Sequence, residues 1–191
     1  MGTLNHTEAM GMCQTLGAKI DALKNAPMQK GGFRKVDKEV IEINMIINNV
    51  VSKTNDIQGF EVKKLHNGSV SSAYHNGLVN TEEIIYGAAN DGVNSVAMAN
   101  RMPGTNIITF NLQSWSSTEE FGVTFNPTVE NLQNTYVHEA GGHFAKGLSH
   151  IPKEHAKVIE IQMKHSSWKN TTPIFKAWMN KVHDNYKDGK N

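Results

Sequence analysis

Apolar residues recur at helical spacing at both ends of this chain. Residues 3 to 25 and 37 to 53 each carry an apolar stripe with the 3.6-residue period of a helix. The last third of the chain shows the same period in residues 126 to 147, 151 to 166 and 171 to 186. Proline stands within the first three positions of each of these three segments, as is typical of helix beginnings. We therefore predict two N-terminal helices and three C-terminal ones.

The middle of the chain has the alternating pattern of strands. Between residues 56 and 112, short alternating segments are separated by glycine and asparagine. Asn67-Gly68 is a two-residue turn signal between two of these segments, and Pro103-Gly104 separates two others. The predicted strands are residues 60–63, 69–74, 93–98 and 106–112. We expect a small, mostly antiparallel sheet packed by helices, and hence an α+β fold.

Composition argues against several classes of partner. The 19 basic and 18 acidic residues give a formal net charge of +1, so no overall field attracts the chain to nucleic acid or to an acidic membrane. The single cysteine, Cys13, excludes an internal disulfide and a zinc site built from paired cysteines. No apolar run approaches the ~20 residues of a membrane span, and no Sec signal is visible at the N-terminus. We expect a soluble protein with neither nucleic acid nor a membrane as its partner.

The chemically richest stretch lies in the first of the C-terminal helices. It contains His138, Glu139 and His143, with Gly141 and Gly142 between the two histidines. On a regular α-helix, residues five apart point about 140° away from each other. A glycine pair allows the helix to accept an extra residue in a π-type turn, which returns such residues to one face. We therefore expect His138 and His143 to bind one metal ion.

A third ligand is expected from the helix that follows, because catalytic zinc sites generally use three protein ligands and water. If the two helices form a hairpin about Ser149, His155 lies opposite His143 and projects toward the pair. His155 is therefore the predicted third ligand. Three alternatives remain open. His150 would need the chain to fold straight back, Glu154 would lie beside the inner face of its helix, and Glu160 would lie on the wrong face of that helix.

The His-Glu-x-x-Gly-His motif resembles the zinc-binding helix of dipeptidyl peptidase III. In that family the two histidines bind zinc and the glutamate is the catalytic base, which implies these roles for His138, His143 and Glu139. The Glu-Glu-x-x-x-Glu helix that supplies that family's third ligand is not found in this chain. The motif also resembles the metallopeptidase-type toxin domains at the C-termini of large secreted bacterial proteins, which match this chain better in size.

The predicted elements form a single domain over residues 1–191. Helices would occupy residues 1–53, the sheet residues 56–112, and the metal-site and C-terminal helices residues 126–186. The resemblance implies a zincin-like arrangement, in which the metal-binding helix is followed by a second helix that supplies a ligand. It also implies a protein or peptide substrate, secretion or delivery by a specialised bacterial system, and a cognate immunity or inhibitor protein.

The sequence thus predicts a zinc-dependent hydrolase, with peptide cleavage as the leading reaction. A zinc-activated water and Glu139 as general base would supply the chemistry. One alternative is a non-catalytic structural or adaptor domain clipped by a metal that His150 also binds. Another is a zinc amidase that acts on cell-wall material. The residue that stabilises the oxyanion is left open among His165, Tyr74 and Tyr136.

Overall fold

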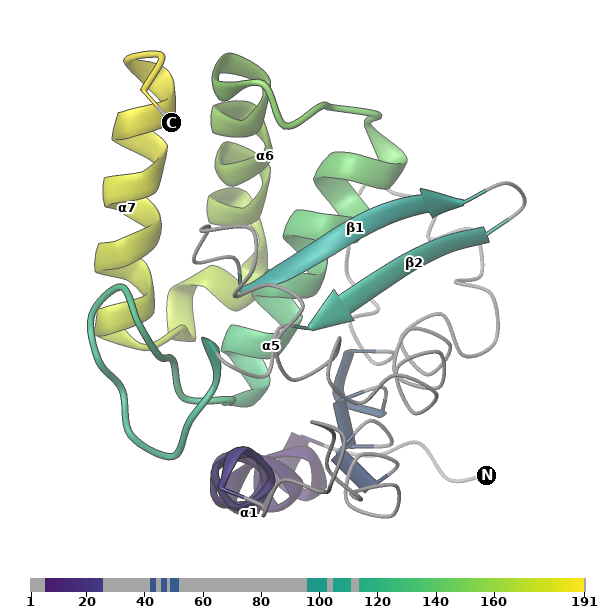
Figure 1. Ribbon diagram of the computed structural model, residues 1–191, viewed down its shortest axis with the longest axis vertical. Coiled ribbons are helices and arrows are strands. Elements are labelled where there is room, and N and C mark those ends of the chain that lie inside the picture. Colours follow the sequence, from purple (N-terminus) through teal and green to yellow (C-terminus); the bar gives the residue numbers. More distant parts are fainter. Residues whose placement is uncertain are drawn as a thin grey trace, which may run out of the picture.

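Helices dominate the described part of the chain. The computed structural model describes residues 6–25, 42–43, 46–47, 49–51, 96–102, 105–110 and 114–190. Its helices are α1 (His6–Lys24), α5 (Val129–Tyr136), the π-helix η2 (Val137–Ala145), α6 (Pro152–Lys164), the 3-10 helix η3 (Ser166–Asn170) and α7 (Pro173–Lys187) (Figure 1). The described residues between 42 and 51 are helical as well. Each of the five segments predicted to be helical therefore contains helical residues.

The two strands of the described part form one antiparallel ribbon, and two isolated bridges, Trp115–Phe125 and Glu120–Thr124, lie outside it. β1 (Ala97–Met102) pairs with β2 (Thr105–Phe110), with Ala97 opposite Phe110. The prediction of a zincin-like α+β fold built on a small sheet is therefore wrong for the described residues, which are mostly helical and form no sheet beyond this ribbon. An alternating pattern locates strands but does not determine how many of them pair. The hairpin predicted around Asn67-Gly68 lies outside the described residues.

α1 packs against the segment that precedes α5. Its apolar face buries Leu16 and Ile20. Gly17 lets the backbone of Ser117 approach closely, because a Cβ atom at position 17 would lie 2.7 Å from Ser117 Cα. Asp21 Oδ2 accepts a hydrogen bond from Ser117 N at 2.9 Å. These contacts fix the N-terminal helix to the C-terminal part of the molecule.

Aromatic side chains hold the segment that leads into α5. Trp115 is fully buried, and its ring lies 6.1 Å from that of Phe110 on β2, centroid to centroid. Phe125 packs against Phe175 and Trp178 of α7, with ring centroids 5.4 and 5.2 Å apart. The segment is thereby fixed to both the ribbon and α7.

α5 continues directly into η2, α6 packs beside η2, and α7 packs beside α6. Thr128 caps α5 by accepting a hydrogen bond from Asn131 N at 3.1 Å, so the helix begins later than Asn126-Pro127 predicted. Gly147, at a φ of 66°, follows the end of η2 and turns the chain toward α6. α6 contacts both η2 and α7, and α6 and α7 run alongside each other in Figure 1. This arrangement positions the site described below.

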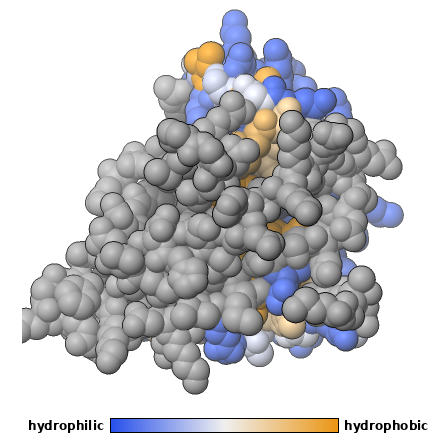
Figure 2. Space-filling view, turned by 90° about the vertical axis from the view of Figure 1, so that its right-hand side faces the viewer, coloured by the Kyte–Doolittle hydropathy of each residue, from blue (hydrophilic) through white to orange (hydrophobic). Residues whose placement is uncertain are grey.

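Apolar residues on the described surface are scattered. In the view of Figure 2 the described surface is mostly hydrophilic, and apolar residues show in small separate areas. The large apolar side chains that are exposed belong to three separate segments; they are Met10, Phe121, Val123 and Ile151. Within the described ranges, no helix has both the length and the apolar character needed to cross a membrane.

Candidate metal centre

The helix that carries the predicted motif is a π-helix. Lys146 N donates a hydrogen bond to the carbonyl oxygen of Gly141 at 3.2 Å, which spans five residues. This bonding pattern widens the helix, so residues five apart come to the same side. The rings of His138 and His143 accordingly lie with their centroids 5.2 Å apart. The predicted π-type turn is confirmed, although it extends over the 9 residues of η2 and not over a single turn.

Gly142 has a second role, which is to let α6 approach η2. A Cβ atom at position 142 would overlap the Val158 side chain on α6 and would lie 2.9 Å from its Cβ. Carbon atoms in contact normally stay about 3.5–4.0 Å apart. Val158 is fully buried, so it has no solvent-filled space into which to move. The separation of η2 and α6 therefore requires glycine, and this separation brings residues of α6 to the motif.

The third histidine, His155, reaches the pair from the first turn of α6. The Nε2 atoms of His138 and His155 lie 2.9 Å apart, and the ring centroids of His143 and His155 lie 5.1 Å apart. One ring nitrogen from each of the three histidines lies within 4.8 Å of the other two. These three residues are therefore close enough to hold a metal ion.

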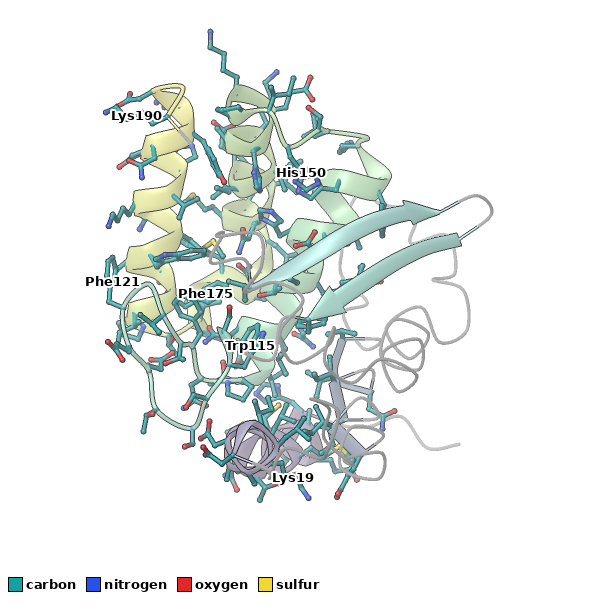
Figure 3. The ribbon with its side chains drawn as sticks, in the orientation of Figure 1. Lys19, Trp115, Phe121, His150, Phe175 and Lys190 are labelled. Atoms are coloured by element: carbon teal, nitrogen blue, oxygen red, sulfur yellow. The ribbon has the colours of Figure 1, made fainter. Side chains whose placement is uncertain are left out.

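The alternatives for the third ligand make other contacts. Glu154 Oε2 accepts a hydrogen bond from Ser149 N at 2.7 Å, and hydrogen bonds from Ser149 lower the pKa of Glu154. This carboxylate thus stabilises the turn between η2 and α6. His150, labelled in Figure 3, is exposed. Its ring centroid lies 4.1 Å from that of His143 and 5.5 Å from that of His155. His150 therefore lies beside the three-histidine cluster, on its solvent side.

Hydrogen bonds at the far ring nitrogens orient two of the three histidines. His143 Nδ1 lies 2.9 Å from the carbonyl oxygen of Leu148. A carbonyl can only accept, so this Nδ1 carries the proton. His138 Nδ1 lies 2.8 Å from Gln162 Oε1 and donates to it. Each neutral ring then keeps a lone pair on Nε2, which is the tautomer that a metal ligand needs.

His155 is held by an aromatic contact from the C-terminal helix. Its ring stacks on Tyr186 of α7, with the centroids 4.5 Å apart and the planes at 21°. Tyr186 is partly buried, and burial raises the pKa of its hydroxyl. α7 therefore supports a site whose donor atoms come from η2 and α6.

The surroundings favour the neutral form of the histidine rings. Burial, followed by the neighbouring His155 and His143, holds the pKa of His138 well below its usual value of 6.5. Burial, followed by His143 and His150, lowers the pKa of His155 to about 3. Both rings are therefore neutral at pH 7, and a metal ion need not displace a proton from a charged imidazolium.

The donor set fits a divalent transition-metal ion. All three donors are imidazole nitrogens, which suit zinc, copper, nickel and iron. With bonds of about 2.0–2.1 Å, two nitrogens bound tetrahedrally to one zinc ion lie about 3.3 Å apart. The Nε2 atoms of His138 and His155 are 2.9 Å apart, and the donor nitrogens of all three histidines lie within 4.8 Å of one another. Rotations of the side chains would bring all three nitrogens to bonding distance of one ion.

Glu139, the predicted base, follows His138 directly on η2. Its side chain is 4% exposed, and among the described residues it is the only acidic residue that is buried. Acidic side chains are rarely buried in proteins without a specific reason. A buried carboxylate next to a histidine that could hold a metal ion is therefore a candidate functional group.

The two described candidates for the oxyanion-stabilising residue are Tyr136 and His165. Tyr136 is 2% exposed, and burial raises its pKa. His165 Nδ1 contacts Ser167 Oγ at 2.8 Å. It follows His155 by ten residues, or roughly 15 Å along a helix. Tyr74 lies outside the described residues.

Sequence reasoning missed Gln162 and Tyr186 as parts of the site. Gln162 follows His155 by seven residues, a spacing that places both on one face of α6. That spacing was the available signal. Tyr186 gave none, because its contact with His155 depends on how α7 packs against α6. Comparison with protein-family models, curated proteins and solved structures finds no match to this chain.

Proposed function

We propose that this protein is a zinc-dependent hydrolase that cleaves peptide bonds. The observation that carries the proposal is the convergence of His138, His143 and His155, whose donor nitrogens lie within 4.8 Å of one another. Two of these histidines belong to a His-Glu-x-x-Gly-His motif on a π-helix, and the buried Glu139 belongs to the same motif. Hydrolytic zinc sites combine three such ligands with an open position and a glutamate that acts as base.

Among the metals that bind three imidazole nitrogens, zinc is the one best suited to hydrolysis. Copper and nickel also bind imidazole, but zinc has no redox chemistry and readily keeps one position open for substrate. The single cysteine, Cys13, is buried in α1, outside the motif. When bound, zinc would polarise the scissile carbonyl and acidify a water molecule.

The protein's own residues would hold and move the protons. His138 donates its Nδ1–H to Gln162 Oε1, and His143 donates its Nδ1–H to the Leu148 carbonyl, so both Nε2 lone pairs stay available. Glu139 would take a proton from the attacking water and pass it to the leaving amine.

Metal content tests the first part of the proposal. We expect the wild type, loaded with zinc and freed from excess, to retain about one ion per chain. His138→Ala, His143→Ala and His155→Ala should each lose most of it under the same conditions. His6→Ala is the matched control, because His6 is an exposed histidine on α1. A wild type that retains no zinc would overturn the proposal.

Glu139→Gln tests the second part, because it keeps the size of the side chain and removes the base. We expect unchanged zinc content and peptide cleavage reduced by about 10²–10⁴-fold. Cleavage would be followed by mass spectrometry on a library of unfolded peptides. Full activity of Glu139→Gln would remove this residue from the mechanism. A zinc-loaded wild type that cleaves no peptide in the library would overturn peptide hydrolysis.

A structural metal site is the second candidate, favoured by the closeness of His150 to the cluster. Its ring centroid lies 4.1 Å from that of His143. A fourth protein ligand would close the site and leave no position for substrate. His150→Ala separates the two: a closed site would lose zinc affinity, whereas an open site would keep it. Binding of a hydroxamate inhibitor to the zinc-loaded wild type would also argue for an open site.

The biological setting is proposed from the motif's resemblance alone. In this setting the protein is a secreted or delivered bacterial effector or toxin, and a cognate inhibitor protects the producer. Expression inside bacterial cells tests it: the wild type should arrest growth, and Glu139→Gln should not. Release of soluble cell-wall fragments from purified peptidoglycan would favour a cell-wall amidase over a peptidase.

A further inference from the structure

A buried amide contacts the metal-site histidine that comes first in the chain. Gln162 is fully buried on α6, and its Oε1 lies 2.8 Å from His138 Nδ1. The amide nitrogen of Gln162 is also buried and has no hydrogen-bond partner within the described ranges. The amide is therefore fixed chiefly by its contact with His138.

The position of Gln162 couples two parts of the site. His155 and Gln162 lie seven residues, or about two turns, apart on one face of α6. α6 therefore carries both a donor ring and the partner of another donor ring. Asn134 Nδ2 on α5 donates to the main-chain oxygen of Gln162 at 3.0 Å, which fixes this turn of α6 against the motif helix.

We propose that Gln162 is a positioning residue for His138, and that its neutral amide keeps the zinc affinity of the site below the level that a carboxylate partner would give. The second half of this inference rests on the proposed zinc site. Because Gln162 Oε1 accepts a hydrogen bond from His138 Nδ1, the lone pair on His138 Nε2 stays directed at His143 and His155. Without this acceptor the Nδ1 proton would have no partner, and the proton would move to Nε2, which lies 2.9 Å from His155 Nε2.

The expectation about zinc affinity rests on the fact that the hydrogen-bond partner of His138 is neutral. Carboxylate partners make a ligating histidine more basic and strengthen its bond to the metal. Here both partners are neutral, since His143 Nδ1 faces the Leu148 carbonyl and His138 Nδ1 faces an amide. The two rings therefore donate less charge, which leaves a bound metal ion more strongly polarising and more easily lost.

Two substitutions at the same position give opposite expectations. Gln162→Leu removes the acceptor and should lower zinc affinity about 10–100-fold, the usual loss for such partners. Gln162→Glu supplies a charged acceptor and should raise affinity about tenfold. Competition with a fluorescent chelator measures both. Gln133→Leu is the matched control, because Gln133 Nε2 donates to the Val50 carbonyl at 3.3 Å on another helix.

Nuclear magnetic resonance of the imidazole nitrogens in the zinc-free protein provides the readout that does not depend on metal. We expect His138 protonated at Nδ1 in the wild type and in Gln162→Glu, and at Nε2 in Gln162→Leu. If the wild type binds no zinc, the proposed function fails, while the tautomer still decides whether Gln162 positions His138. If zinc binds without hydrolysis, the order of affinities still decides the inference.

Specific outcomes would overturn the inference. One is a Gln162→Leu protein that binds zinc as tightly as the wild type and keeps the wild-type tautomer of His138. The other is a Gln162→Glu protein that binds zinc more weakly than the wild type. If Gln162→Leu does not fold, Gln162→Met replaces it, because methionine is unbranched and of similar size. A loss of affinity in Gln133→Leu equal to that in Gln162→Leu would show a general effect of helix packing and would also overturn the inference.

Discussion

Gly142 on η2 and Val158 on α6 lie so close together that a Cβ atom at position 142 would overlap the valine side chain. The contact lies between the two helices that carry the donor histidines. Glycine at this position therefore serves the tertiary packing of the site as well as the local conformation of the π-helix.

Gly142→Ala is expected to destabilise the protein and weaken metal binding. Overpacking in a close contact typically costs about 1–3 kcal/mol, and moving α6 away would withdraw His155. Urea denaturation and zinc titration measure the two effects. Val158→Ala should relieve part of the penalty in the double variant, and independent additive losses would contradict the proposed contact. Gly11→Ala is the control, because a Cβ there meets nothing within 4 Å and alanine favours a helix by about 1 kcal/mol.

Tyr186 is expected to support His155 through its ring and not through its hydroxyl. Tyr186→Phe keeps the stacked ring and should leave zinc affinity within about twofold of the wild type. Tyr186→Leu loses a contact worth about 0.5–1.5 kcal/mol and should weaken zinc binding about 2–10-fold. A chelator competition assay distinguishes the two. Equal losses in both variants would assign the support to the hydroxyl.

The zinc-free protein should lose stability as the pH falls below about 6.5. An unfolded histidine titrates near 6.5, whereas folded His138 titrates well below that value and folded His155 at about 3. The unfolded state therefore binds more protons in this window. Stability is complete above pH 6.5 and falls by up to about 1.4 kcal/mol per pH unit for each ring as the pH drops toward 3.

Urea denaturation in the presence of a chelator between pH 7.5 and 5 measures this dependence. His155→Gln removes one of the two titrating rings and should reduce the slope by about half. A free energy of unfolding that stays constant from pH 7.5 to 5 would show that the rings are not held neutral by the folded protein.

Cys13 is expected to be unreactive in the folded protein. It is 6% exposed, and burial, followed by the charge of Glu130, raises the pKa of its thiol to about 12. Only the thiolate attacks alkylating reagents. At pH 8 the folded protein should therefore react with iodoacetamide about a thousandfold more slowly than the urea-unfolded chain. Similar rates in the two states would place the thiol at the surface.

The local parts of the site could be predicted from the sequence. A Gly141-Gly142 pair between histidines five residues apart predicts a widened helix, and the π-helix η2 forms there. A short turn near Ser149 constrains the next helix to run back along the first, which brings His155 to the pair. These inferences worked because each depends on a few neighbouring residues and on the geometry of one helix or one turn.

The parts that depend on tertiary packing could not be predicted. Alternation in residues 56–112 located the region of β1 and β2 but suggested a larger sheet than the described residues contain. The cap of α5 is Thr128, because its side-chain oxygen accepts the hydrogen bond from Asn131 N. The stacking of Tyr186 on His155 follows from the packing of α7, which no periodicity in the sequence specifies.

All three donor histidines fall between positions 138 and 155. An ion that joins His143 to His155 closes a loop of only about a dozen residues, and the conformational restriction imposed by a cross-link grows with the length of the loop. Metal loss should consequently loosen only the end of η2 and the beginning of α6, while α1 stays packed on the segment before α5. The protein would then exist as a folded apo form that can take up a metal ion again.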